Sequence, residues 1–130
     1  MKCIIAGSRN ITDRTLIDKA INASGWVNEI DEVVSGKASG VDTLGEMWAD
    51  THNITIKSFP ADWKNIDVPI VVVKENKYGK YNALAGFNRN QQMAEYADAL
   101  IAIIKNNSSG TRDMIERMNK LNKKVYVLEV

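Results

Sequence analysis

Several short stretches of this sequence combine glycine with hydroxyl, amide and basic side chains. Three of them directly follow apolar runs: GSRN at 7–10, SGKASGVD at 35–42 and NNSSGTRD at 106–113. A fourth, GFNRN at 86–90, places an arginine beside an asparagine. Glycine lets the backbone approach an anion, the N–H groups at a helix start bind phosphate, and arginine offers a forked donor. This combination is typical of a site for a phosphorylated ligand.

Neither standard phosphate-binding fingerprint is present. The GSRNIT stretch lacks the G-x-G-x-x-G pattern of dinucleotide-binding folds, and Lys37 does not lie in a G-x-x-x-x-G-K-[ST] loop. Gly, Ser and Asn are also ordinary turn and capping residues, so any one of these loops alone carries little weight. The prediction of a site therefore depends on whether the fold brings the four loops together.

Apolar runs alternate with amphipathic segments along the chain. Strands are predicted at 2–6, 31–35, 53–59, 99–104 and 124–130. Helices are predicted at 13–24 with Thr12 as the cap, at 41–51 with Met47 on the inner face, at 88–96, and at 110–122 with Leu121 on the inner face. The alternation predicts a three-layer, Rossmann-like α/β fold with a mainly parallel sheet. Ligands bind beyond the carboxyl ends of such strands, where the polar loops fall.

Residues 60–86 are the least regular part of the chain. The run IVVV at 70–73 has strong β character and is too short for a core helix. It could be an extra edge strand, a hairpin arm or a subunit contact. Because an exposed apolar strand invites pairing, we expect something to cover it.

Composition restricts the class of protein. With 130 residues the chain suits one domain over 1–130, and a net charge of +1 argues against a protein held to nucleic acid by bulk electrostatics. Cys3 is the only cysteine and lies in an apolar run, so we expect its thiol to be buried in the core. Because the chain also has no leader-like start and no apolar run long enough to span a membrane, we expect a cytoplasmic protein. His52 has no second His or Cys beside it, and we expect no metal and no cofactor.

Over nearly its whole length the chain resembles the YspA-like branch of the SLOG superfamily, which groups the DNA-processing protein DprA with the LONELY GUY phosphoribohydrolases. The resemblance rests on GSR, SGKASGVDTLGEMWAD, FPADW, YGKYNALAGFNRNQQMAEYADALIAI, SSGTRDMIERM and KKVYVLEV, in that order. It implies a first strand at the centre of the sheet. In this family a Tyr-Gly-Lys element closely follows the tryptophan at Trp63, but here it stands at 78–80. The resemblance therefore implies a β-rich insertion around 66–77.

The resemblance also implies which residues bind a nucleotide or a nucleotide-derived ligand. The first group lines the pocket from the loops after the first two strands: Gly7, Ser8, Arg9, Ser35, Gly36, Lys37, Gly40 and Asp42. The second group closes the pocket and cradles the phosphate: Arg89, Asn90, Ser109, Gly110 and Thr111. Trp63 could cover the pocket and stack on a base, or it could pack in the core.

Three functions stay open at this point. The first is a module that senses or sequesters a nucleotide-derived small molecule. The second is a LONELY GUY-like phosphoribohydrolase, but the catalytic Glu of the family's G-G-x-G-T-x-x-E motif is replaced here by Met114. Asp42 and Glu46 are weak candidates for its role, and Glu46 is more simply a solvent-facing charge. The third is DprA-like binding of single-stranded DNA, which the near-neutral charge and the lack of an aromatic row argue against.

We also expect the chain to form a homo-oligomer, a dimer or larger. Relatives commonly self-associate, and the run at 70–73 offers apolar surface for such a contact.

Overall fold

The five predicted apolar runs form a single parallel sheet in the computed structural model, which describes residues 1–69, 71–106 and 108–130. The strand order is β3-β2-β1-β6-β7, so the first strand is central, as predicted. The strands of this sheet are β1 (Lys2–Gly7), β2 (Glu32–Ser35), β3 (Thr55–Ser58), β6 (Ala99–Ile104) and β7 (Lys124–Glu129). The helices are α1 (Arg14–Ser24), α2 (Val41–Thr51), α3 (Ala85–Tyr96) and α4 (Ser109–Lys120). In the described part of the chain, none of the helices has the length and apolar character needed to cross a membrane.

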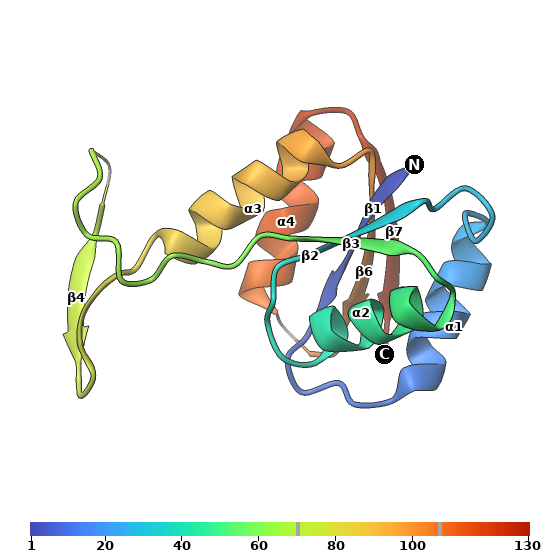
Figure 1. Cartoon of the computed structure of the whole chain (residues 1–130), viewed down its shortest axis with the longest axis horizontal. Coiled ribbons are helices and arrows are strands. Elements are labelled where there is room, and N and C mark those ends of the chain that lie inside the picture. Colours follow the sequence, from blue (N-terminus) through green and yellow to red (C-terminus); the bar gives the residue numbers. More distant parts are fainter. Residues whose placement is uncertain (70, 107) are drawn as a thin grey trace.

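Helices cover both faces of the sheet (Figure 1). Successive side chains of a strand point to opposite faces, so Ile5 and Val33 pack beneath α1 and α2, whereas Ile4 and Val34 pack beneath α3 and α4. Because both faces are covered, the central strands read as continuous apolar runs rather than as an alternating pattern. The predicted three-layer α/β fold is confirmed.

The order in which strands are added to the sheet reverses between β1 and β6. From β1 it proceeds outward to β2 and β3, and it then returns to the other side of β1 to form β6 and β7. In register, Ile4 lies opposite Val34 of β2, and Gly7 lies opposite Ile103 of β6. The carboxyl ends of these three strands are therefore neighbours at the switch point, where open α/β sheets bind their ligands.

Some helix boundaries and faces differ from those predicted. The cap of α1 is Asp13 rather than Thr12, because the Asp13 carboxylate accepts a hydrogen bond of 2.9 Å from the Thr15 backbone N–H. Helix α3 begins at Ala85, three residues earlier than predicted. Met47 is 37% exposed, since α2 buries a stripe that omits it, and Leu121 is 40% exposed because it lies at the C-cap, beyond the last turn of α4.

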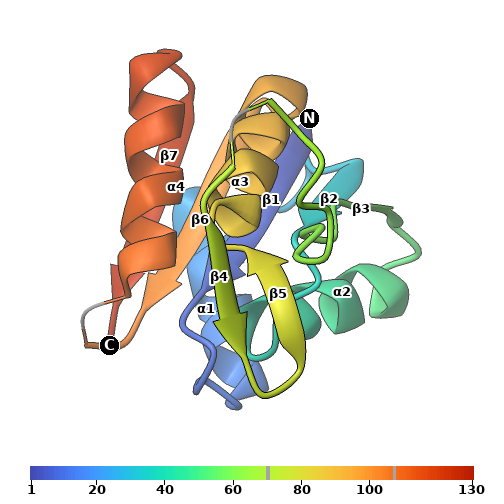
Figure 2. The same cartoon turned by 90° about the vertical axis from the view of Figure 1, so that its left-hand side faces the viewer.

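The predicted insertion is an antiparallel hairpin of β4 (Val73–Asn76) and β5 (Gly79–Asn82), which projects from the body of the molecule near the start of α3 (Figures 1 and 2). Strand β4 lies within the predicted range of 66–77, and β5 lies just after it. Ile70 of the 70–73 run lies outside the described residues, and of the other three residues only Val73 belongs to a strand. Val72 and Val73 are 43% and 47% exposed, so the described chain leaves these two side chains largely uncovered.

The single cysteine belongs to the core. The Cys3 side chain is fully buried in the face that α1 and α2 cover, and burial raises the pKa of its thiol to about 12. A thiol with so high a pKa is a poor nucleophile at neutral pH. The prediction of a buried core thiol is confirmed.

Candidate functional site

A cavity of about 630 Å³ lies beyond the carboxyl ends of β1 and β6. The loops after these strands and the first turns of α2, α3 and α4 contribute to its wall. Nine of the thirteen predicted ligand-binding residues line it: Gly7, Ser8, Arg9, Asp42, Arg89, Asn90, Ser109, Gly110 and Thr111. The fold therefore brings the polar loops together as expected, and the binding roles of these residues stay predictions.

The other four predicted residues do not line this cavity. Gly36 and Lys37 line a neighbouring cavity, and Ser35 and Gly40 line neither of the two. The Ser35 hydroxyl donates to Oε2 of Glu46 at 2.7 Å, and Lys37 Nζ donates to Oε1 of the same carboxylate at 2.7 Å. Glu46 therefore fastens the 35–40 loop to α2. Its side chain is only 19% exposed, so it is not the solvent-facing charge that was expected. It lies outside the lining of the cavity, and a catalytic role for it stays a prediction.

Two glycines allow the loops to approach closely. Gly40 has a φ of 75°, and a Cβ there would lie 2.4 Å and 2.5 Å from the carbonyl oxygens of Ser8 and Arg9. The loops after β1 and β2 thus pack backbone against backbone. A Cβ at Gly36 would lie 2.6 Å from Arg89 Nη1 and 2.9 Å from Asp42 Oδ2. A larger residue at position 36 would therefore require the Arg89 guanidinium or the Asp42 carboxylate to shift.

Asp42 supplies a buried carboxylate in the first turn of α2. Its side chain is 5% exposed, and its Oδ2 accepts a hydrogen bond of 3.3 Å from the Ala38 N–H. Burial raises the pKa of Asp42 from 3.8 to about 6, while the hydrogen bond and the positive charges of Arg89 and Arg9 hold it down. A carboxyl group that titrates near neutrality beside a cavity can exchange a proton with a ligand.

Three basic side chains line the cavity: Arg9, Arg89 and Lys105. Arg89 is held in place, because its Nη1 donates to the carbonyl oxygens of Gly36 and Phe59. Arg9 is exposed, and its guanidinium makes no hydrogen bond or ion pair with any residue that the structure describes. These side chains make the cavity suitable for an anion.

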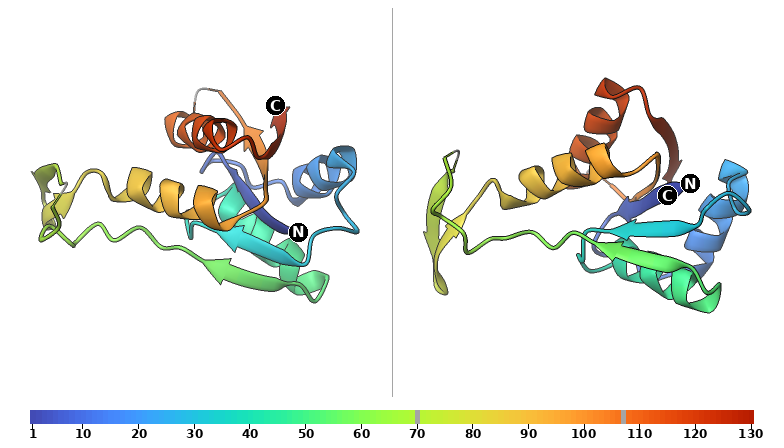
Figure 3. Two further views of the ribbon diagram at one scale, coloured as in Figure 1. Left: turned by 90° about the horizontal axis from the view of Figure 1, so that it is seen from above. Right: turned by 45° about the horizontal axis from the view of Figure 1, so that its top comes forward.

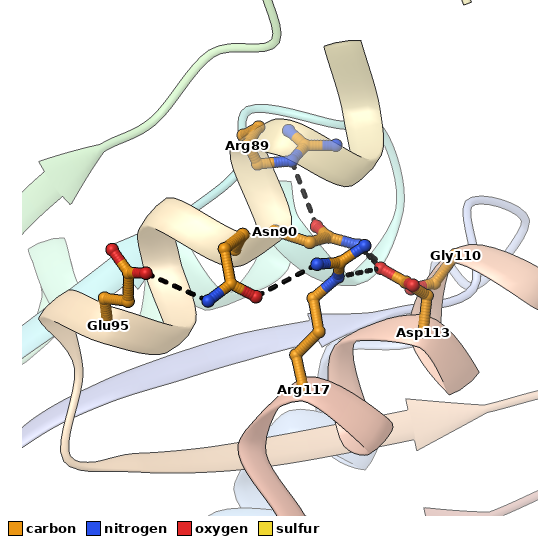
Figure 4. A network of polar contacts seen from close by, with 7 residues as sticks. Arg89, Asn90, Glu95, Gly110, Asp113 and Arg117 are labelled. Carbon is orange, nitrogen blue, oxygen red and sulfur yellow. Dashed lines mark hydrogen bonds and ion pairs between the residues drawn. The ribbon is translucent and has the colours of Figure 1, made fainter. Parts of the chain in front are cut away.

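Asn90 is a structural link rather than a free donor. Its Nδ2 donates to the Gly110 carbonyl at 3.2 Å and to Asp113 Oδ2 at 3.0 Å, and its Oδ1 accepts from Arg89 Nε at 3.1 Å (Figure 4). Arg117 donates to the same Asp113 carboxylate at 2.8 Å. This network joins α3 to α4 and fixes Arg89 relative to the α4 start.

The first turn of α4 presents backbone N–H groups to the cavity. Its N-cap residue Ser108 makes no capping bond to the backbone, because its hydroxyl pairs with that of Thr111 at 2.8 Å. Ser109 and Gly110 are exposed beside it. The Ser8 hydroxyl serves a different purpose, since it donates to the Lys105 carbonyl and accepts from the Lys105 N–H. Ser8 therefore fastens the loop after β1 to the end of β6.

Aromatic side chains also contribute to the wall of the cavity. Trp63 and Phe87 both line it and are 39% and 41% exposed, so Trp63 belongs to the pocket and not to the core. The hairpin base holds Trp63 in place, because the Asn82 N–H donates to the Trp63 carbonyl at 2.6 Å. The sequence analysis did not include Phe87 and Lys105 among the predicted site residues. Phe87 lies in the GFNRN stretch, and Lys105 directly follows β6.

Within the part of the chain that the structure describes, no group of three or more His, Cys, Asp or Glu side chains is placed to hold a metal ion.

Comparison with known proteins places the chain in a family. The YspA, cpYpsA-related SLOG family (YAcAr) matches residues 1–65, which is half of the chain. The fold resembles the crystal structure of DNA processing protein A (DprA) from Streptococcus pneumoniae, with a TM-score of 0.67 and 21% identity over 97% of this chain and 49% of that chain. This chain thus spans about half the length of that protein, and at this identity the likeness shows the fold alone. No curated protein matches the sequence. The chain belongs to the YspA, cpYpsA-related SLOG family.

Proposed function

We propose that this protein binds a nucleotide or another phosphorylated, nucleotide-derived small molecule in the cavity at the carboxyl ends of β1 and β6, and that it acts as a sensor or a sequestering module. One observation carries the proposal: a single cavity of about 630 Å³ joins a helix start, three basic side chains and an aromatic wall. Its volume lies within the range of about 300–1,000 Å³ of small-molecule sites.

The lining of the cavity has groups for both parts of a nucleotide. The cations Arg9, Arg89 and Lys105 and the first turn of α4 suit the phosphate groups, because cations and backbone N–H groups both stabilise an anion. Trp63 and Phe87 suit the base, which gains from contact with an aromatic face. Membership of the SLOG family agrees with a small-molecule ligand.

Native mass spectrometry of gently purified protein, followed by calorimetric titration with a panel of nucleotides, tests the proposal. We expect retained or added nucleotide, and we expect Arg9→Ala to weaken binding about 10- to 100-fold, the usual range for a hydrogen bond to a charged group. Arg14→Ala is the matched control, because Arg14 is an exposed arginine that lines neither cavity. Equal affinity of both variants for every nucleotide in the panel would contradict the proposal.

A phosphoribohydrolase is the alternative, and the buried carboxylate of Asp42 is the observation that favours it. A carboxylate at this position could stabilise the oxocarbenium-like sugar or activate water during cleavage of an N-glycosidic bond. Release of free base and ribose phosphate from a nucleoside monophosphate, abolished by Asp42→Asn, would establish the hydrolase. A bound nucleotide recovered intact after long incubation would establish the binding module.

Two further parts of the proposal concern partners. Binding of single-stranded DNA is the less favoured function; it would appear as affinity for an oligonucleotide that falls steeply as salt is added. We also propose a homo-oligomer of this single-domain chain, in which the exposed hairpin run at Val72 and Val73 supplies apolar contact surface.

A further inference from the structure

A second cavity, of about 370 Å³, opens beside the first. It lies between the loop after β2 and the segment that follows β3. Four residues line both cavities: Arg9, Ala38, Trp63 and Arg89. The two cavities therefore share one wall, and one ligand can reach into both. Figure 3 shows the arrangement of the elements involved, with α3 and the segment after β3 running side by side toward the hairpin.

The shared wall carries two arginines. Arg9 has no hydrogen-bond or ion-pair partner among the described residues. Arg89 uses Nη1 and Nε for its hydrogen bonds to the protein, which leaves Nη2 open within the described chain. Two guanidinium groups at a boundary between cavities suit an anionic group placed at that boundary, since arginine binds phosphate through paired donors.

The second cavity is polar and has no acidic lining residue among the described part of the chain. Lys37 adds a third positive charge to its wall, partly balanced by the ion pair with Glu46. Ser39 and Gly36 offer hydroxyl and backbone groups, and the aromatic lining is limited to Trp63 on the shared wall. This surface suits a sugar or another hydrogen-bonding group attached to phosphate better than it suits a second stacked base.

We propose that the two cavities form one bipartite site for a nucleoside diphosphate that carries a sugar on its second phosphate. The proposal rests on the nucleotide site proposed above and names its ligand class. The nucleoside occupies the larger cavity, Arg9 and Arg89 bind the diphosphate at the shared wall, and the sugar occupies the smaller cavity. Trp63 contacts both parts of the ligand.

Calorimetric titration with matched pairs of ligands tests this class for three different bases. The pairs are AMP and ADP-ribose, GMP and GDP-mannose, and UMP and UDP-glucose. For at least one pair we expect the sugar-linked diphosphate to bind at least about tenfold more tightly than the monophosphate, which corresponds to one added charged contact. ADP, which has the diphosphate but no sugar, should fall between AMP and ADP-ribose if adenosine is the preferred nucleoside.

Variants that fill the smaller cavity separate the two parts of the site. Ala61 and Ser39 line only the smaller cavity, so Ala61→Leu should bring the ratio of the two dissociation constants close to one. Ser39→Leu is the second variant, to be used if the first does not fold. Ala23→Leu, at an exposed position of α1 away from both cavities, is the matched control and should keep the ratio of the natural chain.

The outcomes distinguish this inference from the proposed function. Monophosphates and sugar-linked diphosphates that bind equally, or a filled variant that keeps the natural ratio, would overturn the bipartite site and leave the nucleotide site standing. Failure of every ligand to bind would overturn both.

Discussion

Replacement of Asp42 by Asn tests whether the ionised carboxylate of Asp42 lowers the free energy of unfolding. Asp42 is 5% exposed, and burial raises its pKa from 3.8 to about 6 against the opposing effects of the Ala38 N–H and of Arg89 and Arg9. The native state therefore binds this proton more tightly than the unfolded chain does. Between pH 3.8 and about 6 the native state holds more protons, so the free energy of unfolding falls as the pH rises.

The size of the effect follows from the shift. Each pKa unit corresponds to about 1.4 kcal/mol, so ionisation of Asp42 removes up to about 3 kcal/mol of stability by neutral pH. The asparagine amide has nearly the shape of the protonated carboxyl group and cannot ionise. We therefore expect Asp42→Asn to match the natural chain at about pH 3, below the unfolded pKa, and to exceed it by up to about 3 kcal/mol at about pH 7.5.

Urea unfolding followed by tryptophan fluorescence across this pH range measures the difference directly. Asp50→Asn is the matched control, because Asp50 is an exposed aspartate on the same helix, and it should keep the pH dependence of the natural chain. If Asp42→Asn kept the same pH dependence as the natural chain, or were the less stable protein at pH 7.5, the reasoning would be refuted.

Three further predictions concern the loops, the core and the hairpin. Gly40→Ala should destabilise the fold by about 2 kcal/mol or more in urea unfolding, because of its positive φ and its contact with backbone oxygens; Gly110→Ala, which meets nothing within 4 Å, is the control and should cost little. Cys3 should resist a thiol-reactive dye in the native protein and react at once in denaturant; rapid native labelling would contradict its burial. If the hairpin mediates self-association, Val73→Lys should lower the mass measured by light scattering and the exposed control Glu75→Lys should not; an unchanged mass for both would exclude this surface.

The order of the main elements and the edge of the sheet that carries the cavity could be predicted from the sequence, because both depend on local patterns. Runs such as CIIA at 3–6 and ALIAII at 99–104 are apolar without alternation, which indicates strands buried on both faces. Helices between such runs require parallel pairing. Parallel strands place all their carboxyl ends at one edge, so the polar loops after them had to meet there.

An insertion could be predicted in the hairpin region, but the pairing of its strands could not. Its strands have four residues each; β4 is exposed throughout and β5 fully buries only Asn82, so no continuous apolar face imposed a pattern that could fix their register. Its tie to the site, the hydrogen bond from Asn82 to the Trp63 carbonyl, joins residues 19 positions apart in a stretch without periodicity.

Only the tertiary structure decided what each polar side chain does. Ser35 and Asn90 are of residue types that can donate hydrogen bonds to a ligand. In the structure Ser35 donates to Glu46, and Asn90 donates to Gly110 and Asp113, all of which lie elsewhere along the chain. The raised pKa of Asp42 likewise depends on burial between loops that meet only after folding. Residue type and local period are properties of the sequence, and they determined the fold class and the edge of the sheet that carries the cavity. Burial and hydrogen-bond partners are properties of packing between distant segments, and they determined which polar residues line the cavity and which residues hold its walls together.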